Sequence, residues 1–125
     1  MKILCIDDEP EIRDLLGQFL ELLGHSVVTA NNGQEGWALF SAAPENFDVL
    51  ITDERMPNMS GLDLVKRIRG QGFSLPVIIA SGNLEGEVDE SAKDLQVTAI
   101  ISKPFSLAKL SEILAACAGM TGRSQ

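Results

Sequence analysis

The chain has 125 residues and a formal net charge of -8, with 45% hydrophobic and 22% charged residues, which suits one compact domain with a single core. The acidic balance argues against a nucleic-acid surface, which needs clustered Lys and Arg. No apolar run is long enough to cross a bilayer, and the apolar start is too short for a signal peptide. We therefore expect a cytoplasmic domain that by itself binds neither nucleic acid nor membrane. The initial Met1 leads us to expect a complete chain or the N-terminal piece of a longer one.

Short apolar runs rich in Val and Ile predict strands. In chain order they lie at residues 3–6, 27–30, 49–52, 77–80 and 98–101. None of them alternates polar and apolar residues, which is typical of parallel strands that helices cover on both faces.

Apolar residues at helical spacing predict helices between these runs. The first helix ends at Gly24, and its apolar positions are Ile12, Leu15, Leu16, Phe19, Leu20 and Leu23. A short second helix contains Trp37 and Phe40. A third begins near Ser60 or Gly61 and ends at Gly70 or Gly72, and an acidic fourth spans roughly residues 84–95. The last covers residues 107–117, with Ser106 as its N-cap.

The alternation of strands and helices predicts an α/β fold: a doubly wound, five-stranded parallel sheet with five helices. We expect one domain over residues 1–118 and a frayed C-terminal tail over residues 119–125. Cys5 and Cys117 lie on apolar segments and are expected in the core, because their spacing fits neither a metal site nor a disulfide framework. His25 has no ligand-type partner at suitable spacing and is expected to be structural.

Polar residues follow four of the five predicted strands. Asp7, Asp8 and Glu9 follow the first strand, Asp53 the third, Ser81 the fourth and Lys103 the fifth. In an open parallel sheet, ligands bind outside the carboxyl ends of the strands, so these groups should meet at one edge.

Such a cluster of acids predicts a cation site. Two like charges about 4 Å apart repel by about 4 kcal/mol at an effective dielectric near 20, so the cluster must hold extra protons or bind a cation. Oxygen ligands favour Mg²⁺, with Mn²⁺ or Ca²⁺ as substitutes. Structural alternatives stay open: the three acids after the first strand could cap the first helix, with Pro10 in its first turn. Asp53 could be a turn residue, Ser81 a loop hydroxyl and Lys103 a surface lysine.

At these positions the sequence resembles the CheY-like response regulator receiver family of two-component signalling. The matching segments run in the family's order and spacing from about Lys2 to Ala118, and they are Ile6-Asp7-Asp8-Glu9, Asp53-Glu54-Arg55-Met56-Pro57 with Gly61, Ala80-Ser81-Gly82 and Lys103-Pro104-Phe105. The resemblance implies a flavodoxin-like (βα)5 receiver fold and a regulatory phospho-acceptor domain, which catalyses only its own phosphorylation and dephosphorylation.

The resemblance also implies roles for single residues. Asp53 would accept a phosphoryl group from a phosphohistidine on a sensor histidine kinase or a histidine phosphotransfer protein. Asp8, Asp53 and the backbone carbonyl of Arg55 would ligate Mg²⁺, with Asp7 assisting through water. Ser81 and Lys103 would each contact a phosphoryl oxygen, and Pro104 would hold the lysine's loop. A charge-driven shift of Ser81 would then alter an output surface on the fourth helix, fifth strand and fifth helix.

The chain departs from the family's pattern at the predicted switch. Many receivers carry Tyr or Phe three residues before the lysine, whereas this chain has Ile100, which puts the aromatic part of the switch in doubt. Arg55 and Asn83 occupy variable positions beside the site and are expected to tune dephosphorylation.

Three competing interpretations have weaker support. A phosphatase with Asp53 as nucleophile would need a second acid where Arg55 stands, and a cap domain. A binding module that is never phosphorylated would not need the set Asp8, Asp53, Ser81 and Lys103. A flavodoxin-like cofactor binder would need a phosphate loop where the acids follow the first strand.

Overall fold

The computed structural model describes residues 1–82, 92–103 and 106–120, with residues 119 and 120 as backbone only. Its centre is a parallel sheet with the strand order β2-β1-β3-β4-β5. The strands are β1 (Lys2–Ile6), β2 (Ser26–Ala30), β3 (Val49–Asp53), β4 (Val77–Ser81) and β5 (Ala99–Ser102). The reversal of strand order beside β1 makes the sheet doubly wound, as the sequence predicts.

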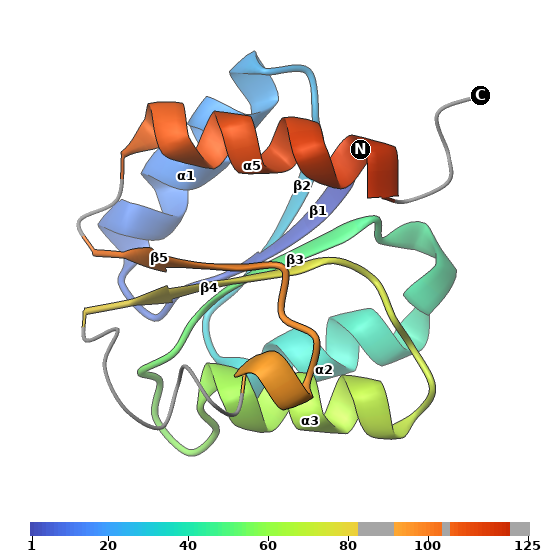
Figure 1. Cartoon of the computed structure of the whole chain (residues 1–125). Helices are drawn as coiled ribbons and strands as arrows, with labels where there is room; N and C mark the ends of the chain where they lie inside the picture. Colours follow the sequence, from blue (N-terminus) through green and yellow to red (C-terminus); the bar gives the residue numbers. More distant parts are fainter. Residues whose placement is uncertain (83–91, 104–105, 121–125) are drawn as a thin grey trace.

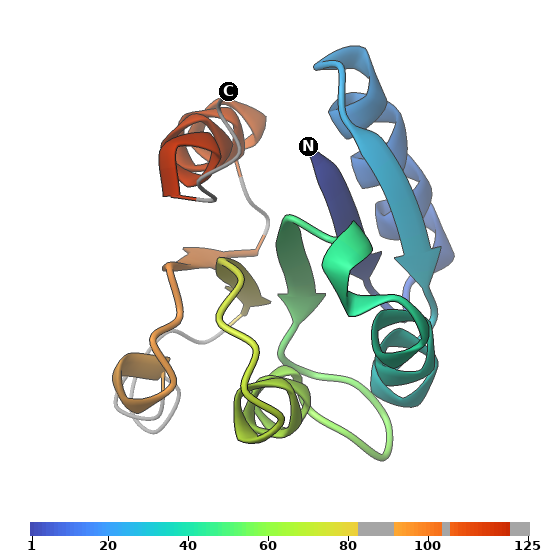
Figure 2. The same ribbon diagram turned by 90° about the vertical axis from the view of Figure 1, so that its right-hand side faces the viewer.

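Helices cover both faces of this sheet. They are α1 (Pro10–Leu22), α2 (Gly33–Ala42), α3 (Gly61–Gly70) and α5 (Leu107–Met120), with a 3-10 turn η1 at Pro44–Asn46. Figure 1 shows α1 and α5 on one face and α2 and α3 on the other, and Figure 2 shows the same layers after a quarter turn. Residues 92–94 are helical and belong to the predicted fourth helix, most of which lies outside the described residues.

Side chains at the helix starts agree with the sequence analysis. Ser60 caps α3 in a capping box, in which its side chain accepts from the Asp63 amide and the Asp63 side chain accepts from the Ser60 amide. Ser106 accepts a hydrogen bond from the backbone N–H of Lys109 at 3.2 Å, which confirms it as the cap of α5. The helix α5 continues to Met120 and so includes the first two residues of the expected tail.

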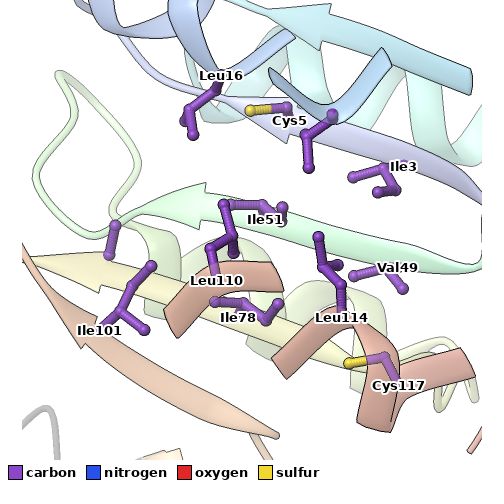
Figure 3. Close-up of a cluster of buried hydrophobic side chains, with 12 residues drawn as sticks. Ile3, Cys5, Leu16, Val49, Ile51, Ile78, Ile101, Leu110, Leu114 and Cys117 are labelled. Atoms are coloured by element: carbon purple, nitrogen blue, oxygen red, sulfur yellow. The ribbon is translucent and has the colours of Figure 1, made fainter. Parts of the chain in front are cut away.

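Two hydrophobic clusters fill the spaces between the layers. One joins the sheet to α1 and α5, and Figure 3 shows Leu110 and Leu114 of α5 pointing at the strands. Cys5 and Cys117 are fully buried in this cluster, which confirms the prediction that both belong to the core. The other cluster joins the sheet to α2 and α3.

Burial differs from the prediction in two places. The strands β2 and β5 form the edges of the sheet and are only partly covered, whereas β1, β3 and β4 are buried along almost their whole length. Leu15 of α1 and its C-cap residue Leu23 are exposed, although both share the helical spacing of the buried Leu16 and Leu20. The apolar face of α1 is therefore wider than the surface it buries.

His25 lies at the end of the sheet opposite the predicted site. Its Nδ1 is 3.1 Å from the amino group of Met1, and Ser26 pairs with Lys2 at the start of β1. Burial and the positive charge of Met1 lower the pKa of His25. These contacts support the structural role expected from the sequence.

Candidate functional site

The sheet brings the predicted groups to one edge. Asp53 is the last residue of β3 and Ser81 the last residue of β4, and both are buried. Asp7 follows β1 directly and is also buried, and Lys103 follows β5. The strands are parallel, so their carboxyl ends, and the polar residues there, fall together.

Lys103 connects the acids of this edge. Its Nζ donates to Asp53 Oδ2 at 3.0 Å and lies 3.3 Å from Asp7 Oδ2. It also lies 3.5 Å from Glu9 Oε1, although Glu9 remains 63% exposed. Side chains from three segments distant in sequence thus meet at one ammonium group, so the spatial convergence predicted from the sequence is present.

The pKa values of Asp53 and Lys103 both lie above their ordinary values, for different reasons. Burial raises the pKa of Asp53, and Asp7 adds to this, against the lowering effects of Lys103 and of the Arg55 backbone N–H. Burial disfavours the charged form of Lys103, but its bonds and charge contacts with Asp53 and Asp7 outweigh burial, so the pKa of Lys103 lies above its ordinary value. The ammonium is therefore firmly charged beside carboxylates that repel one another.

Four acids lie close enough to share a cation. One carboxylate oxygen each from Asp7, Asp8, Glu9 and Asp53 lies within 4.8 Å of the others. They border a cavity of about 470 Å³ lined by Asp8, Glu9, Asp53, Arg55, Gly82 and Lys103. An all-oxygen set next to an open, polar cavity fits a hard cation that keeps some of its water. Lys103 neutralises only part of the cluster, which favours a bound cation further.

The β1–α1 loop holds Asp7 in place through its own backbone. Asp7 Oδ1 accepts from the Glu9 backbone N–H at 2.9 Å, and the Arg13 guanidinium donates to the Asp7 carbonyl at 2.9 Å. Glu9 is the N-cap residue of α1 but makes no side-chain capping bond, so side-chain capping does not account for it. The sequence analysis missed Arg13; its place one turn after the acids was the available signal.

The remaining predicted residues lie beside the cavity or outside the described residues. Arg55 and Gly82 both line the cavity. Ile100 lies in β5 and lines a second hollow of about 540 Å³ with Ser102, Lys109 and Glu112. Asn83 and Pro104 lie outside the described residues. A further acid that the sequence analysis did not single out, Glu54, directly follows Asp53 and is partly buried.

Comparison with known proteins identifies the family. The response regulator receiver domain family matches residues 3–115. Since this is most of the chain, the protein belongs to that family. The described residues include no helix long and apolar enough to cross a membrane.

Similar proteins include both longer sensors and single receiver domains. The chain is 36% identical to the sensor histidine kinase RcsC of Escherichia coli K12 over 114 residues, which is 91% of this chain and 12% of RcsC. It is 36% identical to the sensor protein EvgS of the same organism, over 86% of this chain and 9% of EvgS. The chain thus spans about a tenth of the length of these relatives.

Solved structures match over nearly their whole length. A response regulator receiver domain protein from Clostridium thermocellum is 31% identical, with a TM-score of 0.85, over 95% of this chain and 94% of that one. The chemotaxis protein CheY4 of Vibrio cholerae is 31% identical, also with a TM-score of 0.85, over 93% of this chain and 97% of that one. The flavodoxin-like receiver fold is therefore shared by this chain.

Proposed function

We propose that this receiver domain accepts a phosphoryl group on Asp53 from a phosphohistidine of a sensor histidine kinase or a histidine phosphotransfer protein, in the cytoplasm. The observation that carries the proposal is the buried Asp53 carboxylate, 3.0 Å from the Lys103 ammonium and within one oxygen cluster with Asp7 and Asp8. We assign the receiver to residues 1–118, which enclose the segment matched by the family.

Asp53 acts as the nucleophile in this proposal. One of its carboxylate oxygens attacks phosphorus, the P–N bond of the phosphohistidine breaks, and the imidazole nitrogen leaves with the electron pair. Lys103 pairs with one phosphoryl oxygen and the Ser81 hydroxyl donates to another. Phosphoryl transfer depends mainly on such positioning and charge neutralisation. The product is a mixed anhydride that water hydrolyses, so the signal is temporary.

A divalent ion fits the acid cluster and completes the neutralisation. Asp8, Asp53 and the backbone carbonyl of Arg55 would hold Mg²⁺, with Asp7 assisting through water, and Mn²⁺ or Ca²⁺ could substitute. The bound ion supplies positive charge to the phosphoryl oxygens. The carboxylate oxygens and the open cavity support this choice, because Mg²⁺ is bound by few carboxylates and keeps several waters.

The phosphoryl group adds a charge of about -1.5 to -2 at the edge of the sheet. In our proposal, Ser81 moves toward that charge and the change reaches the surface formed by the fourth helix, β5 and α5. Ile100 lies on this surface beside a hollow between β5 and α5, where many receivers carry an aromatic side chain. The domain acts as a regulatory phospho-acceptor and turns over no other substrate.

Phosphotransfer with Asp53→Asn tests this proposal. Wild type and mutant are incubated with acetyl phosphate and with a panel of phosphorylated kinases, with Mg²⁺ or with EDTA, and intact mass is followed over time. We expect the wild type to gain one phosphoryl group in Mg²⁺. The mutant should gain no phosphoryl group, or gain it far more slowly than the wild type. Equal rates for the two proteins would remove Asp53 from its role, and steady release of phosphate with no accumulating adduct would indicate a phosphatase.

A further inference from the structure

Glu54 lies between Asp53 and Arg55 in the sequence and makes three hydrogen bonds to residues of β4 and α3. Its backbone N–H donates to the Ala80 carbonyl at 2.9 Å, and its carbonyl accepts from the Gly61 N–H at 3.0 Å. Its side-chain Oε1 accepts from the Leu62 N–H at 2.8 Å. One residue thus links the end of β3 to β4 and to the first turn of α3.

The first turn of α3 lies directly against the backbone at the phospho-acceptor. A Cβ atom at Gly61 would lie 2.6 Å from the Asp53 carbonyl oxygen and 3.2 Å from the Glu54 Cα, so only glycine fits there. A carboxylate that accepts from an amide at a helix N-terminus is favourable, because these amides lack partners within the helix. The hydrogen bond from the Leu62 N–H to the Glu54 side chain therefore links the backbone next to Asp53 to the first turn of α3.

The Glu54 carboxylate is separate from the acids that can share a cation. Within the described part of the chain, that group comprises Asp7, Asp8, Glu9 and Asp53. Glu54 instead borders a neighbouring hollow with Asp8 and Arg55. Because the Glu54 carboxylate accepts from Leu62 and lies outside the acid group, we read it as holding the segment around Asp53 in place and not as a ligand of the cation.

We propose that Glu54 is a positioning residue that sets the affinity of the site for its divalent ion. By bonding to Leu62 it fixes residues 53–55, so that the Asp53 carboxylate and the Arg55 carbonyl face the cation together. This inference rests on the proposed function, because that proposal names these two groups as ligands. Residues that orient metal ligands change metal affinity by about 10- to 100-fold when they are replaced.

Two substitutions separate the reach of the side chain from its charge. Glu54→Asp keeps the charge but is one methylene shorter, so the bond to Leu62 is lost or distorted. Glu54→Gln removes the charge but keeps an oxygen at the same reach. Ser60→Ala is the matched control, because it removes the other side-chain cap at the start of the same helix and leaves the Glu54 bond to Leu62 in place. Each protein is titrated with Mg²⁺ by calorimetry and unfolded with urea.

We expect Glu54→Asp to bind Mg²⁺ about 10-fold more weakly than wild type, Glu54→Gln to stay within about threefold, and Ser60→Ala to lose stability without losing affinity. The inference is overturned if Glu54→Asp binds like wild type, if Glu54→Gln is the weaker of the two, or if Ser60→Ala weakens binding as much as Glu54→Asp. Failure of the wild type itself to bind Mg²⁺ would instead overturn the proposed metal site, and this inference with it.

Discussion

Lys103 is the cation that pairs directly with the buried carboxylates at this edge of the sheet. Its ammonium lies 3.0 Å from Asp53 and 3.3 Å from Asp7, both of which are almost fully buried. A buried carboxylate that loses its partner destabilises the folded state, because neither water nor another charge compensates for its removal from solvent. The lysine therefore has a structural role as well as its proposed role at the phosphoryl group.

Replacing Lys103 should expose this structural role. We expect Lys103→Met to lower the free energy of unfolding by about 2 kcal/mol in EDTA, because Asp53 and Asp7 are left uncompensated. Mg²⁺ should restore part of this loss, since the ion supplies the missing positive charge, while phosphorylation from acetyl phosphate should slow strongly. Urea unfolding with EDTA and with Mg²⁺ measures the effect.

Lys109→Met is the control for Lys103→Met, because Lys109 is an exposed lysine on α5. It should change stability by less than about 0.5 kcal/mol in either buffer. A Lys103→Met protein as stable as wild type in EDTA would show that the acids need no compensation.

At the scale of elements, Arg69 joins α3 to two loops. Its guanidinium donates to the carbonyls of Phe73 and Leu75 before β4, at 3.1 and 2.9 Å. It also donates to the carbonyls of Leu95 and Gln96 before β5, at 2.8 and 3.3 Å. Gln96 has a positive φ of 57°, so this turn adopts a backbone conformation that is uncommon for residues other than glycine.

Loss of the Arg69 side chain should loosen both loops. We expect Arg69→Met to lower the free energy of unfolding by about 3 kcal/mol, because several partly buried carbonyls lose a charged donor. Hydrogen exchange should rise in the segment around residues 95–97 while the amides of β1 stay protected. Lys66→Met on the exposed face of the same helix is the control, and an equal loss in both variants would contradict this role for Arg69.

At the scale of the whole molecule, folding itself builds the cation site. Asp53 is far in sequence from Asp7, Asp8 and Glu9, so the unfolded chain does not hold the four acids together. A ligand that binds only the folded state stabilises it by mass action. The net charge of -8 makes self-repulsion within the folded chain a general cost, of which the acid cluster is one part.

Mg²⁺ should therefore raise the stability of the wild type. At a concentration about 100 times its dissociation constant, the free energy of unfolding should rise by about 2.7 kcal/mol. NaCl at matched ionic strength separates specific binding from general screening and should have a smaller effect. Asp53→Asn should weaken the response to Mg²⁺. An identical stabilisation by NaCl would argue against a specific site.

Most of the fold and much of the site could be predicted from local patterns. The Val- and Ile-rich runs predicted all five strands within two residues at either end, and the polar residues after them predicted the edge at which Asp7, Asp53, Ser81 and Lys103 lie. These predictions succeed because strand direction in an alternating α/β chain fixes which strand ends meet. The roles of these residues in phosphoryl transfer stay predictions.

Only the tertiary structure decided which groups actually touch. It assigned β2 and β5 to the edges, left Leu15 of α1 exposed, and showed the contacts that Arg13 and Glu54 make beside the site. Residue spacing reports the period of a helix or strand, whereas such contacts depend on how elements far apart in the sequence are packed. Periodicity and strand-end chemistry were therefore determined by the sequence alone, and edge position, exposure and the hydrogen bonds between elements required the packed chain.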